Sequence, residues 1–319
     1  MNKFLPILLI SIVLISGCKN NSNKASSDTN QLSGSISLSG AFALYPMAQK
    51  WADEFMKLHP DVKIDISAGG AGKGMTDVLS GLVDLAMYSK EISTSEKQKG
   101  AWGISVTKDA VFPVINSHNP YLKELKTTGL KKQQFYDIFI SGKINSWDKL
   151  FNTKGKEKIN VFNRSDACGA AEMWAKYLGK KQEEIKGIGV FGDPGIADAV
   201  KKEKYAIGFN NLVYIYDINT RKKSDGIEII PIDFNENGKI DKEENFYETI
   251  KEITDAVKTN LYPSPPSREL YFVSKGKSNN KIVIEFLKWI LTDGQKFISD
   301  AGYVELPKEV IQNQLKKLQ

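Results

Sequence analysis

The sequence is poor in the residues that hold metals and cofactors or cross-link a chain. Its 319 residues include only 2 His and 2 Cys, too few ligands for a haem protein or a zinc enzyme with several histidines. No charge sign dominates, since 44 Lys and Arg stand against 38 Asp and Glu for a net charge of +6, so a nucleic-acid partner is not indicated. With 41% hydrophobic and 26% charged residues, the composition excludes a multi-span membrane protein and a disordered chain.

The N-terminus has the pattern of an export signal. A basic start at Lys3 precedes an apolar run over residues 4–15, which is too short to span a bilayer stably. Small residues then stand before Cys18, as in a bacterial lipobox, which predicts cleavage before Cys18 and lipidation of its sulfur. An ordinary signal peptide with an incidental cysteine is the alternative.

Residues 1–17 are therefore interpreted as a lipoprotein signal peptide and residues 18–32 as a flexible tether, because the tether has almost nothing apolar to bury. We expect the protein to work outside the cytoplasm, lipid-anchored to a bacterial membrane in the periplasm or at the cell surface. Cys168 then has no intramolecular partner, so no disulfide is expected to support the fold.

Strands alternate with helices in the rest of the sequence, which predicts an α/β fold. Apolar residues spaced three and four apart predict a helix from Leu44 to Leu58, and Val62, Ile64 and Ile66 alternate as in a strand. Trp51 and Trp174 lie on apolar helical faces and are expected in the core. Further expected elements are helices over 75–82 and 171–178, a helix opened by 193–195, a helix that begins at Glu244, and strands at 35–38, 85–87, 159–161, 205–209 and 227–232.

Three loops between a predicted strand and a predicted helix are rich in Gly and Ala, at residues 40–43, 69–74 and 163–170. Unpaired N–H groups and the positive end of the helix dipole make each loop a potential anion cradle, which small residues let a ligand approach closely. Arg164 adds a bidentate donor suited to a tetrahedral oxyanion or a carboxylate.

The order of residues 40–53, 69–74, 83–89, 164–169 and 206–209 resembles that of the phosphate-binding, PstS-like solute-binding lipoproteins of ABC transporters, over nearly the whole mature chain. The resemblance implies the type II periplasmic binding protein fold, with two lobes of mixed or parallel sheet flanked by helices and a ligand cleft between them. We expect the chain to cross between lobes at 111–116 and 268–273, so that the lobes are residues 33–113 plus 271–319 and residues 114–270.

The resemblance further implies binding without chemistry. The implied protein is a monomer without enzymatic activity. It captures an inorganic oxyanion, with phosphate as the expected ligand, and delivers it to an ABC transporter permease. A different small anion, either another oxyanion or a carboxylate, is the alternative, and a secreted α/β enzyme is the competing class. The implied ligand-binding residues are Ala41, Phe42, Ala43, Ala71, Gly72, Ser89, Arg164, Cys168, Gly169 and Ala170.

Several of these positions depart from the family pattern. Ligand hydroxyls are missing at Phe42, Ala71, Cys168 and Ala170, and Ser89 stands where much of the family has an aspartate that accepts the proton of hydrogen phosphate. Backbone amides and Arg164 are then the expected donors. Cys168 is either an inert, buried helix-start residue or a thiol that touches the ligand.

Residues 233–244 match the twelve-residue EF-hand loop. Such a loop supplies oxygens to Ca²⁺ from fixed positions and needs glycine at position 6, here Gly238, for its sharp turn. We expect one unpaired loop with a structural Ca²⁺, because the preceding segment reads as a strand; a solvated acidic turn is the alternative. The expected ligands are Asp233, Asn235, Asn237, Lys239 through its carbonyl, Asp241 and Glu244.

Overall fold

The computed structural model describes residues 32–151, 154 and 156–319. The predicted signal peptide, the lipidation site Cys18 and the tether as far as Gln31 lie outside the described residues. Within the described part, no helix is both long enough and apolar enough to cross a membrane.

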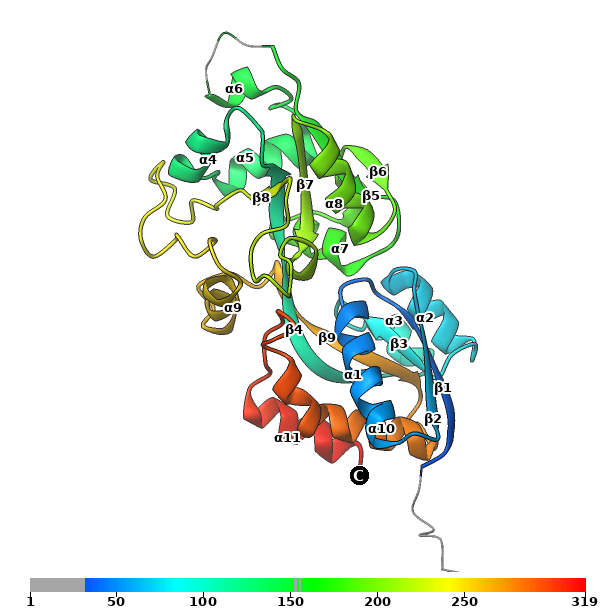
Figure 1. Ribbon diagram of the computed structural model, residues 1–319. Helices are drawn as coiled ribbons and strands as arrows, with labels where there is room; N and C mark the ends of the chain where they lie inside the picture. The colour runs from blue at the N-terminus through cyan, green and yellow to red at the C-terminus, as the bar shows by residue number, and fades with distance from the viewer. Residues whose placement is uncertain (1–31, 152–153, 155) are drawn as a thin grey trace, which may run out of the picture. The chain divides into compact units, whose positions relative to one another are not determined.

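The N-terminal part of the chain builds strands and helices in alternation (Figure 1). Strand β1 (Gly34–Gly40) pairs in parallel with both β2 (Val62–Ala68) and β3 (Leu85–Tyr88). The connections are α1 (Tyr45–Leu58) between β1 and β2, and α2 (Ala71–Leu79) between β2 and β3. Parallel neighbours with helical crossovers place the loops that follow β1, β2 and β3 at one edge of the sheet.

Two long strands join these N-terminal strands to the strands of the middle of the chain. Strand β4 (Ala101–Asn116) pairs antiparallel with β9 (Ser267–Lys275) over residues 101–110. Over residues 111–115 the same strand pairs antiparallel with β7 (Ala206–Asn211), and over residues 114–116 with β8 (Ile227–Ile229). Since β9 also pairs with β3, the strands form one mixed sheet in the order β2-β1-β3-β9-β4-β7-β5-β6, with β8 beside β4.

The middle of the chain repeats the parallel pattern. Strand β5 (Asn160–Arg164) pairs in parallel with β6 (Ile188–Val190) and with β7. Helix α7 (Gly169–Tyr177) follows β5, and α8 (Gly192–Lys202) follows β6. The remaining elements are α3 (Thr94–Gln98), α4 (Leu122–Thr128), α5 (Lys132–Tyr136), a π-helix (Asp137–Ser141), α6 (Trp147–Phe151), α9 (Ile250–Lys258), α10 (Lys281–Leu291), α11 (Lys308–Lys317) and 3₁₀ turns at Gln182–Glu184, Leu212–Tyr214 and Asp293–Phe297.

Two hydrophobic cores define two lobes. The core of lobe 1 draws mainly on residues 32–106 and 270–318, and that of lobe 2 on residues 110–262. Trp51 is fully buried in the first core and Trp174 in the second, as their helical faces predict. The α/β, two-lobed fold is therefore confirmed.

Several predicted boundaries are wrong. The helix expected over 75–82 already begins at Ala71 and ends at Leu79, because Gly81 takes a left-handed conformation with φ of 76° just beyond it. Leu82 is consequently 72% exposed. The strand expected at 227–232 is only β8, and β5 extends to Arg164, which was expected in a loop.

The helix expected to begin at Glu244 begins at Ile250 instead. Thr249 caps it, since its side chain accepts from the amide of Glu252 while the Glu252 carboxylate accepts from the amide of Thr249. The carboxylate of Glu244 turns back into its own loop, where it accepts from the amides of Phe234 and Asn235, so it does not start a helix.

Candidate functional site

The first predicted anion loop leaves two amides without a partner. The amide of Ala41 donates to the carbonyl of Met87, and a tight turn joins residues 41–45 before α1. Within the described part of the chain, the amides of Phe42 and Ala43 donate no hydrogen bond, which suits them to an anion. Gly40 has a φ of 135°, and a Cβ there would lie 2.3 Å from the carbonyl oxygen of Met87. The close approach of β1 to β3 therefore requires glycine at position 40.

The second loop lies against lobe 2. Ala71 begins α2, and the amide of Gly72 donates to the carbonyl of Ala167 at 3.1 Å. A Cβ on Gly70 would lie 2.6 Å from a carboxylate oxygen of Asp166. The amide of Gly72, a predicted donor to the anion, is therefore hydrogen-bonded to the loop after β5 in this structure.

The third loop meets the end of β3. Gly169 and Ala170 begin α7 with unpartnered amides among the described residues, and a Cβ on Gly169 would lie 2.0 Å from the carbonyl oxygen of Ser89. Ser89 itself is 2% exposed. Lys90 and Glu172 form an ion pair at 2.6 Å beside this contact. The loops of both lobes thus lie in direct contact around Ser89.

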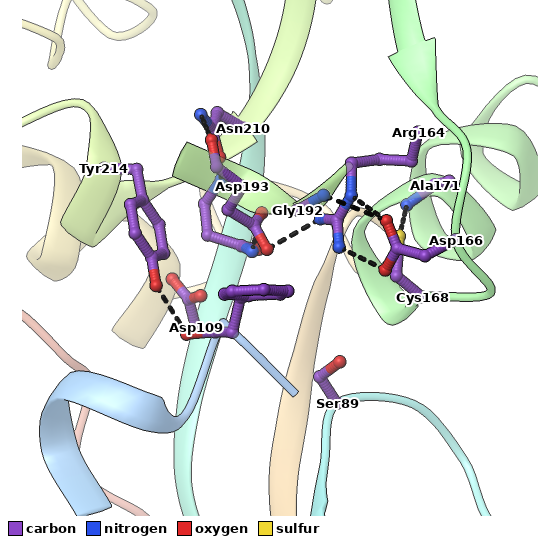
Figure 2. Close-up of polar contacts among 12 residues, drawn as sticks. Ser89, Asp109, Arg164, Asp166, Cys168, Ala171, Gly192, Asp193, Asn210 and Tyr214 are labelled. Carbon is purple, nitrogen blue, oxygen red and sulfur yellow. Dashed lines mark hydrogen bonds and ion pairs between the residues drawn. The ribbon is translucent and has the colours of Figure 1, made fainter. Parts of the chain in front are cut away.

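Arg164 lies between two carboxylates (Figure 2). Its Nε and Nη2 donate to the two carboxylate oxygens of Asp166 at 2.8 and 2.6 Å, and its Nη1 donates to Asp193 at 2.6 Å. Burial alone would lower the pKa of Arg164, but the neighbouring charges, Asp193 first, raise it above its ordinary value. Of the five N–H donors of a guanidinium, two make no hydrogen bond to the described residues and remain for a ligand.

An aromatic ring covers one face of this arginine. The Phe42 ring centroid lies 5.7 Å from the central carbon of Arg164, and the ring meets that of Phe191 edge-on at 5.6 Å. A Cβ on Gly192 would lie 3.0 Å from the Phe42 ring, so glycine gives the ring its space. The side chain of Phe42 therefore packs on Arg164 and orients it. The group of Phe42 that can donate to an anion is its backbone amide.

The thiol of Cys168 is a capping group. Its sulfur accepts from the amide of Ala171 at 3.4 Å, the side chain is 3% exposed, and burial raises the pKa of the thiol to about 12. A neutral, enclosed thiol is a poor nucleophile. Of the two interpretations of Cys168, the structure favours the inert helix-start residue.

A second buried arginine was missed by the sequence analysis. Arg268 is the second residue of β9, and its Nε donates to the Ser89 carbonyl at 3.3 Å. Its Nη1 lies 3.6 Å from Asp109, which stands in β4 where β4 leaves lobe 1. The sequence did offer a signal for Arg268. Arginine is rare in this chain, which has three, and Arg268 begins the expected crossing between lobes.

A pocket of about 510 Å³ lies beside these residues, between α7 and β9. None of the predicted ligand-binding residues lines it. Its lining residues are Glu91, Met173, Lys176, Ser264, Pro265, Ser267, Arg268, Glu269 and Tyr271. Arg268 thus lines this pocket and also contacts Ser89 beside the anion loops.

The predicted calcium loop adopts a compact turn in lobe 2. Gly238 has a φ of 85°, and its amide donates to Asp233 at 2.8 Å. Asp233 is 1% and Glu244 6% exposed, and neither has an ion-pair partner among the described residues. The side chains of Asn235 and Asn237 donate to Asp241, whose carboxylate also pairs with Lys239. Among the described residues, no three His, Cys, Asp or Glu side chains gather closely enough to form a metal site.

Comparisons with known proteins agree on one family. Residues 25–294 match the model of the PBP superfamily domain. The phosphate-binding protein PstS of Staphylococcus epidermidis is 30% identical, with 96% of this chain and 89% of that protein covered, and PstS of Methanocaldococcus jannaschii is 26% identical, with 95% and 90% covered.

A solved structure extends the comparison to the fold. The putative phosphate ABC transporter substrate-binding protein of Clostridium perfringens, solved with bound phosphate, superimposes with a TM-score of 0.70 at 22% identity, covering 86% of this chain and 100% of that chain. The chain therefore belongs to the PBP superfamily and, within it, to the PstS family of solute-binding proteins.

Proposed function

We propose that this protein captures phosphate outside the cytoplasm and delivers it to the permease of an ABC transporter, acting as a lipid-anchored monomer without catalysis. The observation that carries the proposal is the meeting of three helix-start loops around Arg164 and Ser89. Unpartnered amides at Phe42, Ala43 and Ala170 can replace the missing hydroxyl donors, and exclusion of water strengthens such charge-assisted bonds. The naming of relatives as phosphate-binding proteins supports the same ligand.

The test is a calorimetric titration of the purified protein with phosphate and, separately, with sulfate and acetate. We expect phosphate to bind, and Arg164→Gln to weaken binding by about 30-fold or more, since removing one partner of a buried, hydrogen-bonded charge pair costs about 2–5 kcal/mol. Arg221→Gln is the matched control, because Arg221 is exposed. Binding of sulfate or acetate without phosphate would transfer the function to that anion.

We also propose that the loop 233–244 holds a structural Ca²⁺. Two buried carboxylates without a cationic partner, Asp233 and Glu244, stand at its first and last ligand positions and support the proposal. Two hydrogen bonds hold the backbone of the loop to a neighbouring segment: the amide of Ile240 donates to the carbonyl of Thr127, and the amide of Asp233 donates to the carbonyl of Leu130.

Calcium is expected to raise the melting temperature of the protein. A ligand at 100 times its Kd adds about 2.7 kcal/mol of stability, which corresponds to a shift of about 5 °C for a domain of this size. Glu244→Gln should remove the shift because it removes the bidentate carboxylate, whereas Glu243→Gln, its exposed neighbour, should keep it. The measurement is thermal unfolding with millimolar Ca²⁺ against a chelator; equal melting temperatures for the wild type would contradict the proposal.

A further inference from the structure

Arg268 contacts three separate segments of the chain. Its Nε donates to the carbonyl of Ser89 in lobe 1, its Nη1 faces Asp109 on β4, and its Nη2 donates to Asn211 at the end of β7 in lobe 2. The side chain is 6% exposed, and Ser89, Asp109 and Asn211 are between 0% and 3% exposed. One guanidinium therefore joins both lobes at the point where β4 and β9 cross between them.

The contacts continue from Arg268 to Arg164. The side-chain nitrogen of Asn211 donates to one carboxylate oxygen of Asp193, and the other oxygen of Asp193 accepts from Arg164 at 2.6 Å. Asn210 also donates to the backbone carbonyl of Asp193 at 3.0 Å (Figure 2). Asp193 is 2% exposed, so water does not interrupt the chain of contacts. Arg268 thereby influences where the Asp193 carboxylate lies, and Asp193 orients Arg164.

The two arginines differ in how their charge is balanced. Arg164 has two carboxylates at 2.6 Å, from Asp166 and Asp193, which together exceed its charge. Within the described residues, Arg268 has only Asp109 as an ion-pair partner, at 3.6 Å, and neither its Nη1 nor the facing Oδ2 of Asp109 makes a hydrogen bond there. The positive charge of Arg268, beside the Ser89 carbonyl, is therefore less neutralised than that of Arg164, which was the expected cationic donor.

We propose that Arg268 is a positioning residue of the anion site, which holds the Ser89 carbonyl in lobe 1 and, through Asn211 and Asp193, sets the orientation of Arg164 in lobe 2. This inference rests on the proposed capture of phosphate. Only arginine has the planar set of donors that reaches an oxygen on either side at once; a lysine ammonium can satisfy one of these partners but not all.

The first test compares Arg268→Gln, Arg268→Lys and the exposed control Arg221→Gln by phosphate titration of the purified protein. We expect Arg268→Gln to weaken binding by about tenfold or more, Arg268→Lys to restore part of the loss, and Arg221→Gln to bind as the wild type does. Wild-type affinity in a folded Arg268→Gln variant would overturn the proposal.

A double-mutant cycle separates positioning from a merely structural role. Arg164→Lys, Arg268→Lys and the double variant should show a phosphate affinity that departs at least fivefold from the product of the single effects, because the two residues act through one chain of contacts. Multiplicative effects, with no such departure, would overturn the inference.

The same cycle on the free energy of unfolding in urea needs no ligand. A wild type that binds no phosphate would refute the proposed function, while a coupling in the urea cycle would still show that Arg268 acts on Arg164. An additive urea cycle together with intact phosphate binding would refute the positioning role alone.

Discussion

Replacing Gly169 with alanine is expected to weaken phosphate binding by about 100-fold or more while both lobes remain folded. The added Cβ would lie 2.0 Å from the carbonyl oxygen and 2.4 Å from the hydroxyl of Ser89, closer than real Cβ contacts allow. The carbonyl is backbone and also accepts from Arg268, so it cannot move away without breaking that bond. The lobes must separate instead, whereas helix α7 itself gains from alanine, which is a better helix former than glycine.

The measurements are phosphate affinity by calorimetry and the radius of gyration by small-angle scattering with and without phosphate. Gly195→Ala is the matched control, since Gly195 lies inside α8 and its Cβ would meet the nearest atom, in Val190, at an ordinary 3.7 Å. The control should bind phosphate with the affinity of the wild type and should have the radius of gyration of the wild type with and without phosphate. A Gly169→Ala variant within twofold of wild-type affinity would mean that the contact with Ser89 is absent from the bound state.

Local patterns in the sequence predicted the alternation of strands and helices, whereas the two-lobed arrangement was implied by the resemblance to the PstS-like proteins. The apolar spacing in residues 44–58 predicted α1, and the alternation at Val62, Ile64 and Ile66 predicted β2, because each pattern reports one face of one element. Helix ends were less predictable, since they depend on single residues such as Gly81 and Thr249, whose conformation or capping partner decides where the helix stops or starts.

The candidate site was predictable only in part. Loop composition identified the segments around Phe42, Gly72 and Gly169, and the structure brings them together at Ser89 and Arg164. The partners of Arg164 were not predictable. Asp193 reaches it from the start of another helix, and Arg268 reaches it through Asn211, so these contacts arise from tertiary packing and leave no local pattern.

The contribution of Asp109 to the stability of the protein is expected to fall as the pH rises from about 4 to 6. Burial raises the pKa of this carboxyl to about 6, against the opposing effects of Arg268 and of backbone amides, and the charge of Asp193 adds to the rise. Below the ordinary value of 3.8, the carboxyl is protonated in both the folded and the unfolded chain. Between 3.8 and 6 only the folded chain retains the proton, so folding loses up to about 3 kcal/mol across this interval and nothing more above it.

Asp109→Asn removes this titration while keeping the shape of the side chain. The free energy of unfolding of the variant, measured in urea at intervals from pH 4 to 7, should therefore gain up to about 3 kcal/mol relative to the wild type as the pH rises to 6. Any loss of the Arg268 contact adds a cost that does not depend on pH in this range, because an arginine stays charged throughout it. Asp198→Asn, with a side chain that is 62% exposed in the wild type, should give a pH profile parallel to that of the wild type. A parallel profile for Asp109→Asn would show that the Asp109 carboxyl is already ionised at pH 4, and that burial at the crossing of β4 and β9 does not hold its proton.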